Sequence, residues 1–168
     1  MEKARKILLP ISWTMFALLS ILIIVEAATP GDLSSSQSGF LANLVANFLH
    51  LFSNIPEDIY LRLEGFLRKA IGHFGLFLFT GSWGMLAFLL SLEGKKRFYL
   101  LSFLLAFLIG SILAFGSEGI QLIPALSRSG EFTDSLIDLS GYLVGLLLVW
   151  LIVFLIHRKK DAPSKKED

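Results

Sequence analysis

Residues 98–115 read FYLLSFLLAFLIGSILAF, a run without a single charged side chain. Crossing the hydrocarbon of a bilayer takes about 20 predominantly apolar residues. Three further runs, at about 7–27, 71–91 and 136–156, are comparably apolar. The sequence therefore predicts an all-α integral membrane protein, in which four spanning helices pack as a four-helix bundle within a single membrane domain, residues 1–168.

The composition supports this class and excludes several functions. Hydrophobic residues make up 54% of the chain, with 15 Phe, whereas soluble domains contain roughly 45–50% apolar residues. The net charge is only +1, and nucleic-acid-binding domains concentrate basic charge on one face, so we expect no nucleic-acid partner. The chain has no cysteine, which excludes disulfides, thiolate metal sites and cysteine nucleophiles.

The basic residues predict the orientation of the chain. Four of them (Arg62, Arg68, Lys69 and Arg128) lie on one side of the predicted spans, and eleven lie on the other. The richer side holds Lys3, Arg5, Lys6, Lys95, Lys96, Arg97, Arg158, Lys159, Lys160, Lys165 and Lys166. By the positive-inside rule this side is cytoplasmic, and it includes both termini and the basic tail 157–168.

The first apolar run also resembles a signal peptide, with a weak cleavage site at Val25-Glu26-Ala27. We prefer an uncleaved membrane anchor, because the run exceeds the roughly 7–15 apolar residues of a signal peptide. Cleavage would also leave an odd number of spans.

Residues 28–70 separate the first two spans, and the topology makes them an outer, extracytoplasmic segment. The segment opens with the turn-rich TPGDLSSSQSG at residues 29–39. From Phe40 to Phe52 apolar residues recur at helical spacing, with asparagines on the opposite face. This pattern predicts an amphipathic helix in the outer interface of the membrane. A second helix is expected after Pro56.

Residues 117–141, SEGIQLIPALSRSGEFTDSLIDLSG, carry the polar groups that need an explanation. Charge near hydrocarbon costs on the order of 2.5–3.5 kcal/mol per group at the centre of a spanning helix. The topology brings Glu118 and Gln121, the start of the last span and His73 to one depth at the outer boundary. We expect Glu118, Arg128 and Asp134 to lie together, with Arg128 paired to Glu118, Asp134 or Asp138. Lys69 is an alternative cation for the two aspartates.

These residues also carry a resemblance to a known family. Three motifs follow one another along the chain: LRKAIGHF at residues 67–74, then E-x-x-Q, then R-S-G-E-x-x-D-x-x-x-D-x-x-G-x-x-x-G. Together they give the chain, over about residues 66–146, a pattern that resembles the VanZ-like family of small bacterial membrane proteins. The resemblance implies a place in the bacterial cytoplasmic (inner) membrane. Its recurring positions fall on Lys69, His73, Glu118, Gln121, Arg128, Asp134, Asp138, Gly141 and Gly145. We take the first seven as candidate ligand-binding residues, and the last two, a GxxxG pair, as a helix-packing motif.

The chain departs from the family pattern at several polar positions. Ser117, Ile120 and Leu76 stand where many relatives have Asp, His and an acidic residue. These losses remove candidate proton carriers and metal ligands, so they favour a binding protein over an enzyme. The founding member of the family is associated with resistance to teicoplanin, a glycopeptide that acts outside the cell on peptidoglycan precursors.

The sequence does not require a cofactor or a metal ion, and we expect none. A lone histidine at the start of a helix is more often hydrogen-bonded than catalytic, and the chain has no H-E-x-x-H spacing. The sequence is compatible with a zinc site made of His73 and two of Glu118, Asp134 and Asp138, but it does not require one. No G-x-S-x-G motif indicates a serine hydrolase.

Three functions are left open. The first is binding of a lipid-linked envelope molecule at the outer leaflet, such as a peptidoglycan precursor, or a change in the access of a glycopeptide to it. The second is an intramembrane enzyme that acts on a lipid headgroup, with Glu118 or His73 as general base. The third is a small transporter or flippase component. Membrane lipids are expected partners in all three, and a homo-oligomer is left open.

Overall fold

A computed structural model describes residues 2–50, 56, 59, 62, 65–94 and 97–161. Within these residues all secondary structure is helical, in the order α1 (Glu2–Ala27), α2 (Gly31–His50), η1 (Arg68–Gly75), α4 (Leu76–Leu92), α5 (Phe98–Gln121), η2 (Pro124–Leu126) and α6 (Phe132–Asp161). Here η1 is a π-helical segment that runs straight into α4. Four stretches are long and apolar enough to cross a membrane: Glu2–Ala27, Gly65–Leu92, Phe98–Gln121 and Phe132–Arg158. The predicted all-α architecture with four spanning helices is confirmed.

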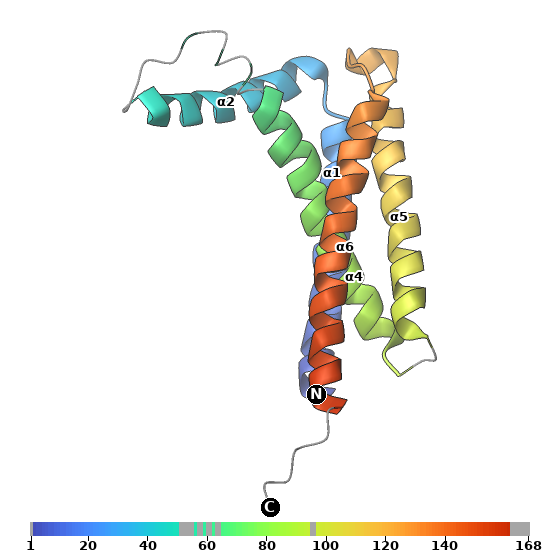
Figure 1. The fold of residues 1–168 in the computed structure, drawn as a ribbon. Coiled ribbons are helices and arrows are strands. Elements are labelled where there is room, and N and C mark those ends of the chain that lie inside the picture. The colour runs from blue at the N-terminus through green and yellow to red at the C-terminus, as the bar shows by residue number, and fades with distance from the viewer. Residues whose placement is uncertain are drawn as a thin grey trace, which may run out of the picture.

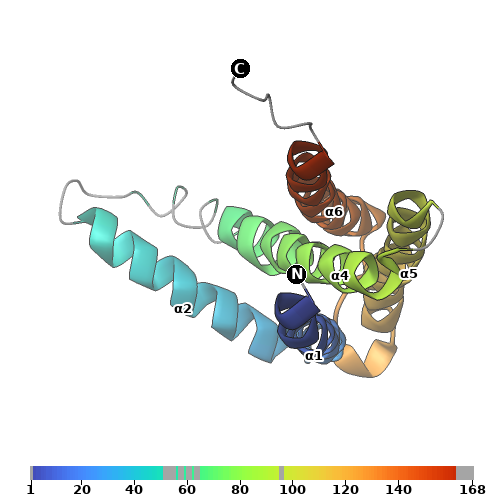
Figure 2. The same cartoon turned by 90° about the horizontal axis from the view of Figure 1, so that it is seen from below.

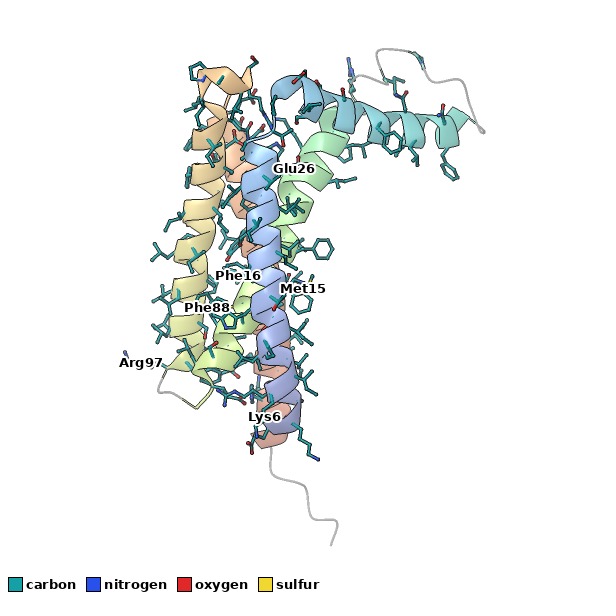
Figure 3. All side chains as sticks on the ribbon, turned by 180° about the vertical axis from the view of Figure 1, so that it is seen from behind. Lys6, Met15, Phe16, Glu26, Phe88 and Arg97 are labelled. Atoms are coloured by element: carbon teal, nitrogen blue, oxygen red, sulfur yellow. The ribbon has the colours of Figure 1, made fainter. Side chains whose placement is uncertain are left out.

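The four long helices run side by side, and α4 is the central one. It packs against α1, α5 and α6, and seen along the bundle it lies between α1 and α6 (Figure 2). We call the end of the bundle with η1 and the α5–α6 connection the upper end (Figure 1). Glu26 marks the upper end of α1, whereas Lys6 and Arg97 lie at the opposite, lower end (Figure 3).

Two of the helices extend well past the apolar runs. Helix α5 continues to Gln121 and α6 already begins at Phe132, beyond the 98–115 and 136–156 runs that the sequence marked. An apolar run marks only the part of a helix that lies in the hydrocarbon of a membrane. The helix itself continues for as long as its backbone hydrogen bonds can form. The polar side chains near these ends therefore sit on rigid helix, one turn apart, instead of in a loop.

Helix α2 begins earlier than expected, at Gly31 instead of Phe40. Pro30 precedes it, and the Pro30 carbonyl accepts the first helical hydrogen bond from Ser34 N at 3.0 Å. A proline is well suited to this position, because the first N–H groups of a helix have no partner within the helix and proline lacks that group. The turn-like TPGDLSSSQSG thus enters a helix at its third residue.

Helix α2 runs sideways from the upper end, across the direction of the spanning helices (Figure 1). Its exposed apolar side chains include Leu33, Phe40, Leu44 and Phe48. A helix that lies across the bundle and exposes apolar groups has the character of an interfacial helix. The second helix expected after Pro56 lies largely outside the described residues.

Close backbone contact between α6 and the η1–α4 segment sets the geometry of the upper end. A Cβ added at Gly141 would collide with the carbonyl oxygen of Phe74, and one added at Gly145 would collide with that of Leu78. Only glycine admits such an approach, as in other GxxxG contacts between spanning helices. Asp138, one turn before Gly141, is thereby brought beside His73, the neighbour of Phe74.

Candidate functional site

His73 is the centre of a buried polar cluster at the upper end. Its Nδ1 lies 3.0 Å from Asp138 Oδ1 and 3.9 Å from Glu118 Oε1, and its Nε2 lies 3.7 Å from Asp134 Oδ2. The His73 side chain is 12% exposed, and those of Glu118, Asp134 and Asp138 are 7%, 7% and 1% exposed. Three carboxylates from two helices thus surround one imidazole from η1, with little access for water.

Two hydrogen bonds fix the Glu118 carboxylate. Gln121 Nε2 donates to Oε1 at 2.8 Å from the next turn of α5, and the backbone N–H of Glu131 donates to Oε2 at 2.9 Å. The second bond is possible because the α5–α6 connection folds back over the end of α5, where a Cβ on Gly130 would collide with the Glu118 carbonyl oxygen. Both oxygens of Glu118 are therefore oriented before any ligand arrives.

Lys69 supplies the cation for Asp134. Its Nζ lies 2.5 Å from Asp134 Oδ1 and 3.7 Å from Glu131 Oε2. Lys69 is one turn before His73 on η1, and Asp134 is one turn before Asp138 on α6. The two helices therefore meet through two stacked pairs, Lys69 with Asp134 and His73 with Asp138.

Arg128 contacts different groups from those expected. Its Nη1 donates to the carbonyl oxygens of Glu26 at 2.9 Å and Thr29 at 3.4 Å, while the structure places the Lys69 ammonium against Asp134 and the His73 imidazole against Asp138. The last carbonyls of a helix lack intrahelical donors and form the negative end of its dipole, so a guanidinium is stabilised there. Arg128 therefore holds the end of α1 against the α5–α6 connection, and its expected pairing with a carboxylate stays a prediction.

A cavity of about 330 Å³ lies beside this cluster, and its walls are partly polar and partly apolar. Its apolar walls include Leu22, Ile23, Ile71, Leu76 and Phe77, and its polar wall includes His73, Glu118, Gln121, Arg128 and Asp138. A second cavity, of about 210 Å³, has a more polar wall that includes Ser34, Ser35, Glu131 and Asp134. His73, Gln121 and Arg128 line both cavities.

All seven residues expected to bind a ligand therefore lie at the upper end, and five of them line the larger cavity. Asp134 lines the smaller cavity, and Lys69 is held against the site by Asp134. Chemically, the inner part of the site offers carboxylate oxygens to a cation or to hydrogen-bond donors. His73, Glu118 and Asp138 are also close enough to hold a metal ion together.

Two features of the site were not predicted from the sequence. Glu131 holds Glu118 through its backbone N–H, a role that no side-chain pattern reveals. The start of α2, with Ser34 and Ser35, lines the smaller cavity, although its residues were expected to form a turn-rich linker. Pro30 followed by Asp32 was the available signal, because it is typical of a helix start.

Comparison with known proteins agrees with the motif. A model of the VanZ/LLP1 family matches residues 12–154, most of the chain. No curated protein and no solved structure is significantly similar to it. The matched region covers α1 from residue 12 onward, all of the next two helices that can span a membrane and most of the last one, together with every residue of the upper-end cluster. The chain therefore belongs to the VanZ/LLP1 family.

Proposed function

We propose that this protein binds the polar head of a lipid-linked envelope molecule at the outer leaflet, and so alters the access of a glycopeptide antibiotic to that molecule. The observation that carries the proposal is the larger cavity, in which apolar walls meet a buried polar cluster. A molecule with a hydrocarbon tail and a polar head matches both parts. The volume of about 330 Å³ is near the lower end of the range for small-molecule sites, roughly 300–1,000 Å³.

The chemistry of the polar wall favours a headgroup rich in hydrogen-bond donors. Glu118 and Asp138 present carboxylate oxygens, which accept from hydroxyl, amide or ammonium groups. Sugar hydroxyls and peptide amides of a peptidoglycan precursor supply such donors. Arg128 lines both cavities, where its guanidinium suits a phosphate or carboxylate of the same molecule.

The outward orientation rests on the basic residues of the sequence, which favour the lower end as the cytoplasmic one. The chain has no cysteine, so single-cysteine variants test this directly. In intact cells a membrane-impermeant thiol reagent should label Ser129→Cys, in the upper connection, and should not label Lys96→Cys. The reverse pattern would place the cavity on the cytoplasmic side and contradict the proposal.

Binding is tested with the full chain in lipid nanodiscs and a photoreactive lipid-linked peptidoglycan precursor. Arg128→Ala should lower the crosslinking yield strongly, and Arg128→Lys should restore only part of it, because an ammonium lacks the planar fork that grips two oxygens. Arg5→Ala is the matched control, since Arg5 Nε also donates to a backbone carbonyl, that of Leu90, at 2.9 Å, but at the lower end. Equal crosslinking in all variants, or none in the parent, would refute the proposal.

In cells, glycopeptide susceptibility and the binding of labelled drug should follow the same order of variants at equal membrane levels. If the protein binds the precursor but does not change drug access, the two parts of the proposal separate: the binding site is supported and the antibiotic role is contradicted.

An intramembrane enzyme is the second candidate, and one observation favours it. The His73–Asp138 contact at 3.0 Å can orient an imidazole beside a cavity, as a general base requires. Release of a headgroup product from the bound lipid, abolished in His73→Ala, would identify an enzyme. Binding without turnover identifies the first function.

A further inference from the structure

We propose that His73, Glu118 and Asp138 bind one divalent transition-metal ion. The three residues come from η1, α5 and α6, and a nitrogen or oxygen of each lies within 4.8 Å of those of the other two. An imidazole and two carboxylates form a ligand set that suits ions such as Zn²⁺ or Mn²⁺. The inference is independent of which lipid the cavity accepts.

The distances are close to those of a formed site. Ligand atoms about 2.0–2.2 Å from a tetrahedral zinc ion are roughly 3.3 Å from one another. His73 Nδ1 and Asp138 Oδ1 are 3.0 Å apart, and His73 Nδ1 and Glu118 Oε1 are 3.9 Å apart. Both distances from His73 Nδ1 are thus within about 0.6 Å of that spacing, and the carboxylate oxygens of Glu118 and Asp138 lie within 4.8 Å of one another.

Asp138 provides independent evidence for a ligand. The residue is 1% exposed, and none of the described residues donates a hydrogen bond to its buried Oδ2. A buried carboxylate oxygen without a donor is costly, and such atoms in native proteins usually have a partner. A metal ion bound by both oxygens of this carboxylate would satisfy Oδ2.

The charges also call for a cation inside the cluster. Lys69 contacts Asp134, whereas Glu118 and Asp138 converge on one imidazole. Two buried carboxylates that share a site repel one another unless a cation lies between them. A divalent ion would neutralise both of them, with His73 as a neutral ligand.

The surrounding contacts resemble those that support metal ligands. With Nδ1 on the metal, the other nitrogen of His73 faces Asp134 Oδ2 at 3.7 Å, and a carboxylate on the second nitrogen is the usual support of a metal-bound histidine. Glu118 is held by Gln121 Nε2 and by the backbone N–H of Glu131. All three proposed ligands line the larger cavity, so an open coordination position would face it, as in sites with three protein ligands.

The experiment uses the full chain in detergent with its affinity tag removed. The protein is stripped with EDTA and titrated with Zn²⁺ and with Mn²⁺, and bound metal is measured by equilibrium dialysis and elemental analysis. We expect one ion per chain. The variants His73→Ala, Glu118→Gln and Asp138→Asn should each lose more than about 100-fold in affinity, since outer contacts alone are worth roughly 10–100-fold.

The lower end supplies matched controls. His157 Nε2 lies 3.7 Å from Glu93 Oε1, a histidine and a carboxylate that do not belong to the proposed site. His157→Ala and Glu93→Gln should bind the metal as the parent does. Co²⁺ gives a second readout, because its visible absorption reports a nitrogen ligand and should change in His73→Ala and not in His157→Ala.

A variant that fails to fold is replaced by Asp134→Asn, which keeps all three ligands and should lower the affinity about 10–100-fold. Binding of less than one ion per chain by the parent, or parent-like affinity in both Glu118→Gln and Asp138→Asn, would overturn the proposal. These measurements contain no lipid-linked precursor and no glycopeptide. A failure to bind metal would therefore not contradict the proposed lipid binding, and a failure of lipid crosslinking would not contradict the metal site.

Discussion

Both ends of the bundle place a histidine beside an acidic side chain, but the surroundings of the two pairs differ. At the lower end His157 Nδ1 lies 2.8 Å from Tyr99 Oη, and Nε2 lies 3.7 Å from Glu93, whose other oxygen is 3.5 Å from Arg5 Nε. The Glu93 and His157 side chains are 27% and 30% exposed. One carboxylate is thus shared between one guanidinium and one imidazole, in reach of water.

At the upper end three carboxylates surround His73, and all of them are nearly inaccessible. The lower cluster therefore has the features of a clasp that joins the ends of helices: balanced charge and partial exposure. The upper cluster has excess negative charge, an oxygen on Asp138 to which no described residue donates and an adjoining cavity. Burial and charge balance, and not residue type, separate a clasp from a candidate binding site.

The largest effect is expected from a change that forces the upper end apart. In Gly141→Leu the new side chain would collide with the Phe74 carbonyl oxygen, which cannot turn aside as a flexible side chain can. We expect the free energy of unfolding to fall by about 3 kcal/mol, the upper part of the range for overpacking. Unfolding of the purified protein by SDS in mixed micelles measures the change.

Gly116→Leu is the control for this prediction, because a Cβ there meets no atom within 4 Å. Its free energy of unfolding should stay within about 1 kcal/mol of the parent value, since replacing glycine in a helix also removes a propensity cost. Equal destabilisation by both variants would show that the α6 contact with η1 and α4 does not set the geometry of the upper end.

Much of this architecture follows from the sequence. Length and apolar runs sufficed for the four spans, because the hydrocarbon core tolerates few other backbone structures. Spacing along single helices also placed His73, Glu118, Asp134 and Asp138 at one depth. The spacing of residues along single helices does not predict which side chains pair between helices. In the structure Lys69 contacts Asp134, whereas Arg128 contacts the end of α1. That choice depends on how the α5–α6 connection folds, which is a tertiary property.

The second largest effect is expected from His73→Ala in metal-free protein. It removes the donor to Asp138 Oδ1 and leaves both oxygens of a buried carboxylate without a hydrogen-bond donor among the described residues, at a cost of about 1–3 kcal/mol. His157→Ala at the lower end should cost less than about 1 kcal/mol, because Glu93 keeps its contact with Arg5 and water reaches the site. SDS unfolding of both variants gives the comparison.

A double-mutant cycle sharpens the result for His73. In Asp138→Asn the charge is gone, so adding His73→Ala should cost clearly less than it does in the parent. Additive losses would mean that His73 stabilises the bundle through packing alone, and the upper pair would then resemble the lower clasp.

A smaller effect is expected from Lys69→Met. Breaking a buried ion pair can cost about 3–5 kcal/mol, but the Lys69 side chain is 37% exposed while that of Asp134 is 7% exposed, so screening by water reduces the loss to about 1–2 kcal/mol. Asp134→Asn in the Lys69→Met background should recover part of the stability by removing the stranded charge. No recovery would argue that the loss in Lys69→Met does not come from the unpaired charge of Asp134.

The smallest effect is expected from the Glu2–Lys6 pair at the lower end. Its atoms are as close as 2.7 Å, but the two side chains are 80% and 73% exposed, and such pairs four residues apart in a helix contribute about 0.3–0.5 kcal/mol. Lys6→Ala should therefore leave the free energy of unfolding within about 0.5 kcal/mol of the parent. Raising the salt concentration should remove even this difference, because exposed charges are screened, while the cost of Lys69→Met should largely persist since Asp134 is buried. A Lys6→Ala loss as large as that of Lys69→Met would mean that distance, and not burial, decides the strength of the ion pairs in this bundle.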